Sequence, residues 1–238
     1  MSEPLTIISL FNLSIAFIPV FIVVFILIKW HLPYKPTLIA LTRMLVQLLL
    51  VGYFLTYIFA SESAQVVLVL LIVMVLFSSK IALSNIKPIT NSLYFNAFLA
   101  ISLSSVFTLL VITQGVLMIQ PWYKAQTVIP LAGMIFASAM NSVSLCGERF
   151  YAEIAHNESY EKARNIAFHA SMIPNINALL AVGIVSLPGM MTGQILSGTS
   201  PFIAARYQIM VMCMIFASAG LASACFLYLN KKTQSLPK

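Results

Sequence analysis

Seven stretches of this chain are long and apolar enough to cross a lipid bilayer. They cover residues 5–28, 38–59, 65–84, 93–113, 127–146, 172–196 and 204–229. About 20 apolar residues in a helix span the roughly 30 Å hydrocarbon core of a bilayer. Lipid offers the backbone no hydrogen-bond partners, so a crossing segment must pair its own backbone groups as a helix.

The composition agrees with this interpretation, because 61% of the 238 residues are hydrophobic and only 8% are charged. A soluble domain of this length carries far more charge. The sequence therefore predicts an all-α polytopic membrane protein with about seven transmembrane helices. It also predicts a single transmembrane domain over 1–238, with one substantial polar segment at 147–171.

The distribution of positive charge predicts the orientation of these helices. Glu3 precedes the first stretch and Lys29 follows it, which indicates a retained helix with its N-terminus outside and not a cleaved signal peptide. All the Lys and Arg residues except Lys124 and Arg206 then face the inside. They are Lys29, Lys35, Arg43, Lys80, Lys87, Arg149, Lys162, Arg164, Lys231, Lys232 and Lys238. The C-terminus is predicted to be cytoplasmic, and the net charge of +7 requires no nucleic-acid partner.

The sixth stretch contains a break, SLPGMMTGQILSG, at residues 186–198. Its clean apolar part, from Ile173 to Leu187, has fifteen residues and reaches only about 22 Å as a helix. The crossing must therefore include Pro188, which lacks a backbone donor, and Gly189, which accepts unusual backbone dihedrals. Carbonyl groups freed within a membrane must be buried in protein or face water.

Two interpretations of this break stay open. In the first, freed backbone groups line a hydrated route, and Thr192 and Gln194 add polar side chains to it. In the second, Pro188 only kinks the helix, and Gly189 and Gly193 form a small-residue face for close packing. The adjacent Met190 and Met191 serve either as soft contacts for a cargo or as flexible filler.

Three asparagines are candidates for the inner mouth of such a route. Asn141 lies toward the inner end of the fifth stretch, and Asn175 and Asn177 lie at the inner end of the sixth. Buried amides between helices usually form interhelical hydrogen bonds, so a purely structural role is the alternative. The six acidic residues are all glutamates, and neither they nor the three histidines lie within the stretches. The membrane-spanning stretches therefore offer no carboxylate or histidine for a proton relay. The sequence does not identify residues that would bind a metal ion.

The inner segment GERFYAEIAHNESYEKARNIAFHAS, at 147–171, is predicted to be helical. Glu158 and Lys162 are four residues apart in the order that favours an ion pair. The segment is either a helical extension lying on the membrane surface or a docking handle for a cytoplasmic partner. The candidate docking residues are Glu148, Arg149, Glu153, Glu158, Glu161 and Arg164.

The chain carries none of the motifs that indicate catalysis. It has no GxxxxGK[ST] loop, so we do not expect it to hydrolyse ATP. It has no GxSxG or HExxH sequence either. The sequence predicts a transport protein that is not an enzyme and binds no cofactor itself.

Several segments resemble one family of transporters. They are TRMLVQLLLVGYFLTYIF (42–59), IPLAGMIFASAMN (129–141), IPNIN (173–177), VGIVSLPGMMTGQILSG (182–198) and ARYQIMV (205–211). Together they resemble, in order, the permease subunit of the bacterial FetB/YbbM-type ABC transporters, which are described as iron exporters. Related plant permeases are linked to aluminium tolerance and nucleotide-sugar export. One departure is a shorter loop between Glu148 and Pro174, which lacks the family's Leu-Gly-Ala-(Thr/Ser)-Pro turn.

The resemblance implies a multi-pass permease of the bacterial inner membrane that pairs with a second copy of itself. It also implies a separate cytoplasmic ATPase that binds ATP and magnesium and docks on 147–171. The expected function is iron efflux through a route lined by the asparagines and the broken sixth helix. The residues alone also allow an ATPase-independent channel or facilitator for a small solute or a metal chelate. A structural scaffold is a third alternative.

Overall fold

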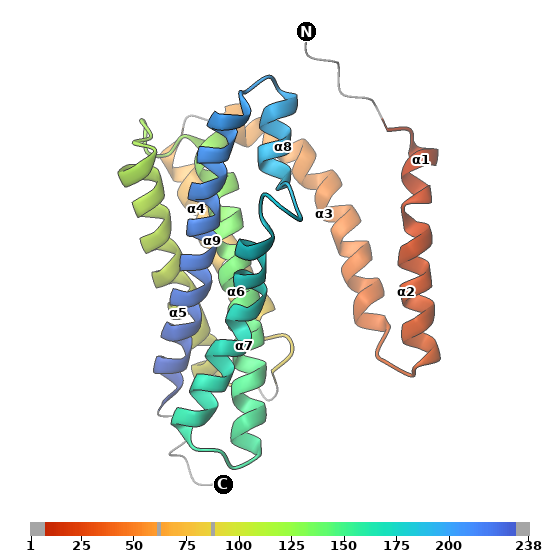
Figure 1. Ribbon diagram of the computed structural model, residues 1–238, viewed down its shortest axis with the longest axis vertical. Coiled ribbons are helices and arrows are strands. Elements are labelled where there is room, and N and C mark those ends of the chain that lie inside the picture. The colour runs from red at the N-terminus through yellow and green to blue at the C-terminus, as the bar shows by residue number, and fades with distance from the viewer. Residues whose placement is uncertain (1–7, 61–62, 87–88, 232–238) are drawn as a thin grey trace. The chain divides into compact units, whose positions relative to one another are not determined.

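The computed structural model (Figure 1) describes residues 8–60, 63–86 and 89–231. In this described part, regular structure is helical apart from one isolated bridge between Val182 and Ser186. The chain divides after Ala60 into two compact units. The predicted all-α fold is confirmed, while Lys87, Lys232 and Lys238, which count toward the predicted orientation, lie outside the described residues.

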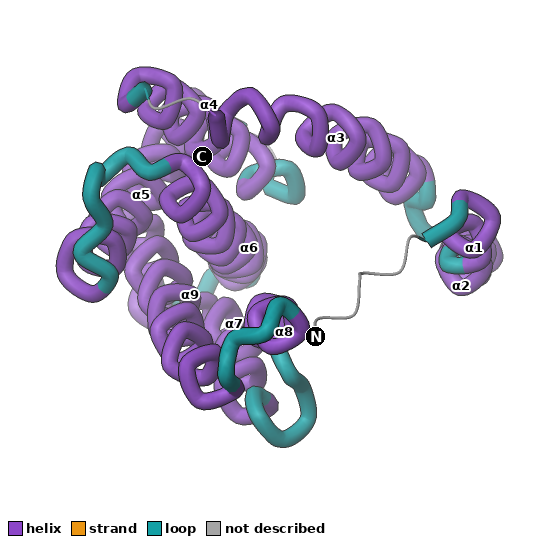
Figure 2. Tube along the Cα trace, turned by 90° about the horizontal axis from the view of Figure 1, so that it is seen from above, coloured by secondary structure: helices purple, strands orange, loops and turns teal. Residues whose placement is uncertain are grey.

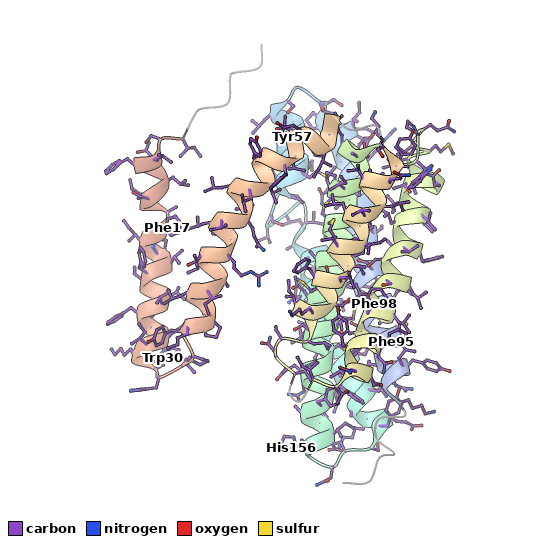
Figure 3. All side chains as sticks on the ribbon, turned by 180° about the vertical axis from the view of Figure 1, so that it is seen from behind. Phe17, Trp30, Tyr57, Phe95, Phe98 and His156 are labelled. Atoms are coloured by element: carbon purple, nitrogen blue, oxygen red, sulfur yellow. The ribbon has the colours of Figure 1, made fainter. Side chains whose placement is uncertain are left out.

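In the first unit, almost none of the side chains of the helices is buried. The helices are α1 (Leu10–Ile15), α2 (Phe17–Lys29) and α3 (Lys35–Ala60). The Ser9 side chain caps α1 by accepting a hydrogen bond from the Asn12 N–H at 3.1 Å. In α1 and α2 only Val24 is buried, and apolar side chains stand out all around α2 and α3 (Figure 3). Such a surface suits surroundings of lipid tails rather than water.

The second unit is a bundle arranged around one long helix, α6. Its elements are α4 (Ala64–Ala82), α5 (Asn91–Leu110), the π-helical turn η1 (Val111–Val116), α6 (Ala125–Ala155), α7 (Tyr160–Ala181), α8 (Gly189–Leu196) and α9 (Pro201–Leu229). Helix α6 contacts α4, α5, α7 and α9, and Figure 2 shows this arrangement end-on. The short α8 packs against α9.

Small side chains allow the helices of the bundle to approach closely. Ala97 and Ala100 of α5, Ala139 of α6, and Ala219 and Ala222 of α9 have no exposed surface. Small residues at helix contacts bring backbones together and increase van der Waals packing within a membrane. The centre of the bundle is therefore closely packed.

The predicted spans correspond well to the observed helices. Among the described residues, six segments qualify as membrane spans by length and hydropathy: Leu10–Lys29, Lys35–Phe59, Ala64–Ala82, Asn91–Val116, Ala125–Ala155 and Pro201–Leu229. The sixth predicted stretch is the interrupted pair α7 and α8, which agrees with about seven spans. The orientation and the single domain over 1–238 stay predictions.

Gly147 offers a test of the packing around α6. A Cβ atom there would lie 2.5 Å from Ile86 Cδ1 and 3.2 Å from Phe226 Cε1, and both side chains are buried. At Gly133 on the same helix, the nearest atom would be Met74 Cε at 3.6 Å, which is an ordinary contact. We expect Gly147→Ala to be less stable than Gly133→Ala by about 1–3 kcal/mol because of overpacking. Thermal unfolding in detergent measures this, and equal melting temperatures would contradict the packing.

Candidate functional site

Helices α6 and α7 form a long hairpin that contains the predicted inner segment. Residues 156–159 connect them, and His156 lies near the tip (Figure 3). Helix α6 runs unbroken for 31 residues, which is about 46 Å against a hydrocarbon core of about 30 Å. The helical prediction for 147–171 is confirmed. Because 147–155 continues the same helix beyond the length that the core requires, the structure favours a segment that projects from the membrane over one that lies on its surface.

Apolar side chains hold the projecting part of the hairpin together. The Phe150 ring packs edge-on against Tyr151 and Tyr160, with centroids 5.4 and 5.9 Å away. The Tyr160 hydroxyl donates a hydrogen bond to the Leu227 carbonyl of α9 at 2.9 Å. Burial raises the pKa of Tyr160, and the positive charge of Arg164 opposes this rise. These aromatic side chains face α9, so they are not free to bind a partner.

Charged side chains lie on the outer surface of the same hairpin. Lys162 binds Glu158 at 2.7 Å, as predicted, and Arg149 binds Glu153 at 2.6 Å. The hydrogen bond from Lys162 to Glu158 raises the pKa of the lysine. Glu161 is exposed near the tip. The hairpin thus presents a charged surface on a rigid apolar support.

A groove between α6, α7 and α9 brings two of the predicted route residues together. It has a volume of about 450 Å³ and is lined by both Asn141 and Asn175. Its other polar lining residues are Ser138, Ser142 and Ser171. The lining contains amides and hydroxyls but no charged side chain. The remaining lining residues are apolar: Met134, Ala137, Leu145, Pro174 and Ile215. The groove is thus uncharged and mostly apolar, and the role of Asn141 and Asn175 at an inner mouth stays a prediction.

A second groove connects this site to the charged hairpin. It has a volume of about 730 Å³ and shares Leu145 and Pro174 with the first. Glu148, Arg149 and His169 lie along it. The two grooves together form a trough along α6 and α7, from Asn141 to the projecting end of the hairpin.

A cluster of buried serines supports the wall of the first groove. The Ser142 and Ser223 hydroxyls lie 2.8 Å apart and share a hydrogen bond, and the Ser171 hydroxyl donates to Ser223 at 3.3 Å. Ser142 also donates to the Ser171 carbonyl at 3.4 Å. These bonds connect α6, α7 and α9. Sequence reasoning missed the cluster, because serines scattered among alanines do not show which of them meet in space.

Pro174 creates a second feature that sequence reasoning missed. It lies inside α7 and lines both grooves. Proline has no N–H, so the carbonyl of Ala170, four residues earlier, lacks its usual helical partner. Ala170 itself lines the larger groove. A backbone acceptor is therefore released next to the trough.

The predicted interruption of the sixth span is present, but it begins before Pro188. Helix α7 ends at Ala181, and a turn at 182–188 separates it from α8. Gly183 has φ +82° and donates to the Ser186 carbonyl at 2.9 Å, and the Val185 N–H bonds the Ala181 carbonyl at 2.8 Å. Positive φ favours glycine. The predicted unusual dihedral at Gly189 is wrong, since Gly189 is helical and Gly183 makes the turn.

The residues of α8 lie apart from the two grooves. Thr192 donates to the Pro188 carbonyl at 3.2 Å, and the Gln194 Oε1 atom is buried with no partner among the described residues. An added Cβ at Gly189 or Gly193 would meet nothing within 4 Å in this chain. The predicted close packing of these glycines therefore does not occur within the described part of one copy. None of the predicted route residues Asn177, Pro188, Gly189, Met190, Met191, Thr192 and Gln194 lines either groove.

The described residues contain no group of three or more His, Cys, Asp or Glu side chains that could hold a metal ion. The acidic and imidazole groups at the trough are Glu148 and His169, both on the projecting hairpin. A cargo in the first groove would therefore meet uncharged amides and hydroxyls among apolar side chains.

Long apolar helices, a charged hairpin and a trough whose inner groove is uncharged define a multi-pass α-helical membrane protein. Residues 10–161 and 155–234 match the family described as Uncharacterised protein family (UPF0014). The chain belongs to this family. The two matched stretches overlap at 155–161, around the tip of the hairpin.

Relatives occur in bacteria and plants. The UPF0014 membrane protein slr1647 of Synechocystis is 36% identical, over 76% of each chain. The probable iron export permease protein FetB of Escherichia coli is 34% identical, over 83% of this chain and 81% of its own. The protein ALUMINUM SENSITIVE 3 of Arabidopsis thaliana is 25% identical, over 80% and 74%. No solved structure matches the chain. The bacterial relatives agree with a location in the bacterial inner membrane.

Thiol labelling tests whether the first groove contains water. In a background with Cys146, Cys213 and Cys225 replaced by alanine, we expect Asn141→Cys to react with a membrane-impermeant maleimide. Leu103 on α5 is 60% exposed and serves as a lipid-facing control. Thiolates form in water and not in lipid, so labelling at 141 should be roughly tenfold faster or more than at 103. Equal, slow rates would show that the groove is filled by lipid.

Proposed function

We propose that this chain is the transmembrane permease subunit of an ATP-binding-cassette exporter that carries iron out of the cell. The observation behind the proposal is that the unbroken helix α6 carries both a projecting charged surface and the wall of a polar groove. A force applied at one end of a continuous helix reaches the other end. A transporter driven from the cytoplasm needs such a connection.

The relatives support this function. A relative that is 34% identical over most of both chains is named a probable iron export permease. The chain has no phosphate-binding loop, so ATP and magnesium belong to a separate ATPase subunit. The ATPase docks on the hairpin through Glu148, Arg149, Glu153, Glu158, Glu161 and Arg164.

The serine cluster gives the coupling a physical basis. Movement of the hairpin displaces α6 and α7 together, because Phe150 and Tyr160 pack against each other. The hydrogen bonds among Ser142, Ser171 and Ser223 carry this movement to α9. Asn141 and Asn175 lie on the wall that moves. Nucleotide binding in the ATPase thereby widens or narrows the inner mouth.

The turn at 182–188 separates the moving part from the outer part of the route. Helix α8 follows this turn and packs on α9. A loop between two helices can absorb changes in φ and ψ that a continuous helix cannot. Asn177 and Pro188, Gly189, Met190, Met191, Thr192 and Gln194 belong to the route beyond this hinge.

The proposed permease works as a homodimer. Asn141 and Pro174 are exposed in one copy, so a single chain does not enclose a passage. A second copy facing the trough closes it with the same residues, as two-fold symmetry requires. The passage is then lined by two sets of amides and serine hydroxyls.

Reconstitution tests the function directly. The permease and the ATPase that co-purifies with it are placed in vesicles, and iron movement is measured with and without ATP. ATP-dependent movement supports the exporter. Movement through the permease alone, at an equal rate without ATP, would identify the rival facilitator. Metal chelates are compared with free iron in the same assay.

Charge reversal tests the docking surface. We expect Glu161→Lys to lower ATP-driven transport about tenfold or more, because like charges across an interface disfavour association. Lys124→Glu reverses a charge at the opposite end of α6 and should have no such effect. Both variants must keep the wild-type melting temperature. Full activity of Glu161→Lys would exclude this part of the hairpin from docking.

The hinge is tested at Gly183. A β-branched side chain is strained at φ +82°. Gly183→Val should therefore distort the turn and raise its conformational free energy by about 1–3 kcal/mol. We expect slower transport with the ATPase still bound. Val185→Ala, in the same turn, is the matched control. Normal transport by a folded Gly183→Val protein would show that the turn has no role.

A further inference from the structure

The end of the bundle that carries the hairpin has a third groove, on the α9 side of α7. It has a volume of about 320 Å³. Tyr160, Arg164 and Phe168 line it from α7, and Ala224 and Tyr228 line it from α9. None of the residues predicted to line the transport route lies in this groove. It shares Asn165 with the larger groove of the trough, and its other lining residues are different.

Two positive side chains converge on one aromatic ring at this groove. The Arg164 guanidinium carbon lies 5.8 Å from the centre of the Tyr160 ring, and the Lys231 Nζ atom lies 5.9 Å from it. Cations are attracted to aromatic faces at such distances. Two positive charges thus lie near one ring, although they belong to segments far apart in the sequence. Arg164 lines the groove itself, and Lys231 reaches the Tyr160 ring from outside the lining.

Neither of these cations has an acidic partner in the part of the chain that the structure describes. Arg149 and Lys162 on the same hairpin do have such partners. The Arg164 Nε and Nη2 atoms donate to the Asn165 Oδ1 atom at 3.1 and 3.0 Å. This neutral contact orients the guanidinium and leaves its charge uncompensated. Arg164 in the groove and Lys231 beside the Tyr160 ring therefore supply positive charge that attracts anions.

The rest of the groove is apolar and extends along the bundle. Tyr160, Arg164 and Phe168 are four residues apart and lie on one face of α7, so Phe168 is about 12 Å from Tyr160 along the helix. Phe168 is exposed, and Ala224 and Leu227 of α9 lie beside it in the groove. The site has a positive end beyond the span and an apolar end that points into it.

We propose that this groove binds an anionic phospholipid, with the phosphate at Arg164 and Lys231 and an acyl chain along Phe168 and Ala224. A soluble anion would use only the two cations, whereas a lipid uses the whole groove. Basic pockets between transmembrane helices on the cytoplasmic side bind such headgroups. The bound lipid would connect the base of the hairpin to the membrane surface.

Arg164 is also a candidate for ATPase docking, so the experiment must measure lipid retention and not transport. The full-length protein is purified in mild detergent and given equal amounts of phosphatidylglycerol and phosphatidylcholine with identical acyl chains. Native mass spectrometry counts the lipids that remain bound. We expect the wild type to prefer phosphatidylglycerol.

The variant Arg164→Gln/Lys231→Gln should lose this preference, by about fivefold for each cation removed. Arg149→Gln/Lys162→Gln removes the same charge from the same hairpin and should keep the preference, because those cations already have acidic partners. Equal preference in the first double variant and the wild type would overturn the proposal. If that variant does not fold, Arg164→Lys should keep the preference and Arg164→Gln should lose it.

Inorganic phosphate distinguishes a lipid site from a general anion site. Phosphate at matched ionic strength should displace phosphatidylglycerol no better than chloride does, since the apolar end of the groove contributes to lipid binding. Stronger displacement by phosphate would assign the two cations to a soluble anion and reject the lipid. Equal retention of both lipids by the wild type would reject the site altogether.

Discussion

The absence of hydrogen-bond partners in lipid is the constraint on which the rest of this structure depends. It forces long helices, and it limits where a helix can be broken. In α7 and α8, Pro174 removes one backbone donor and the turn at 182–188 removes several helical bonds. Pro174 lies at the two grooves, and the turn bonds its own backbone groups between Ala181 and Ser186. The backbone groups released within the sixth span are thus either at a groove or paired with one another.

Close packing around α6 determines what that irregular segment can do. Alanines with no exposed surface bring α5, α6 and α9 together, and the serine hydroxyls connect α6, α7 and α9. Under the proposed mechanism, a helix held in this way moves together with its neighbours. The hairpin continues the same helix, so its charged surface and the groove would move as one element. The proposed hinge is the turn after Ala181.

The sequence predicted features that depend on local chemistry, such as the spans, the helical inner segment and the Glu158–Lys162 pair. It also placed Asn141, Asn175 and Asn177 toward the inner ends of two spans. Asn141 and Asn175 line one groove and Asn177 does not, and their role in transport stays a prediction. The sequence attributed the backbone turn to Gly189, because the preceding Pro188 is a known helix breaker. The real turn at Gly183 depends on bonds to Ser186 that no local pattern specifies. The serine cluster was missed because a buried serine can equally bond its own helix, as Ser79 does.

The uncharged lining of the groove agrees with a transport function under the proposed mechanism. Carboxylates or imidazoles would bind a transition metal tightly, and a cargo held too firmly is not released. Amides and hydroxyls interact with a hydrated ion or a chelate weakly enough for it to pass. Selectivity then arises from the shape of the passage between two copies and from the energy supplied at the hairpin. A permease of this kind therefore needs no resident metal site, and the cost of moving the cargo falls on the ATPase and not on the route.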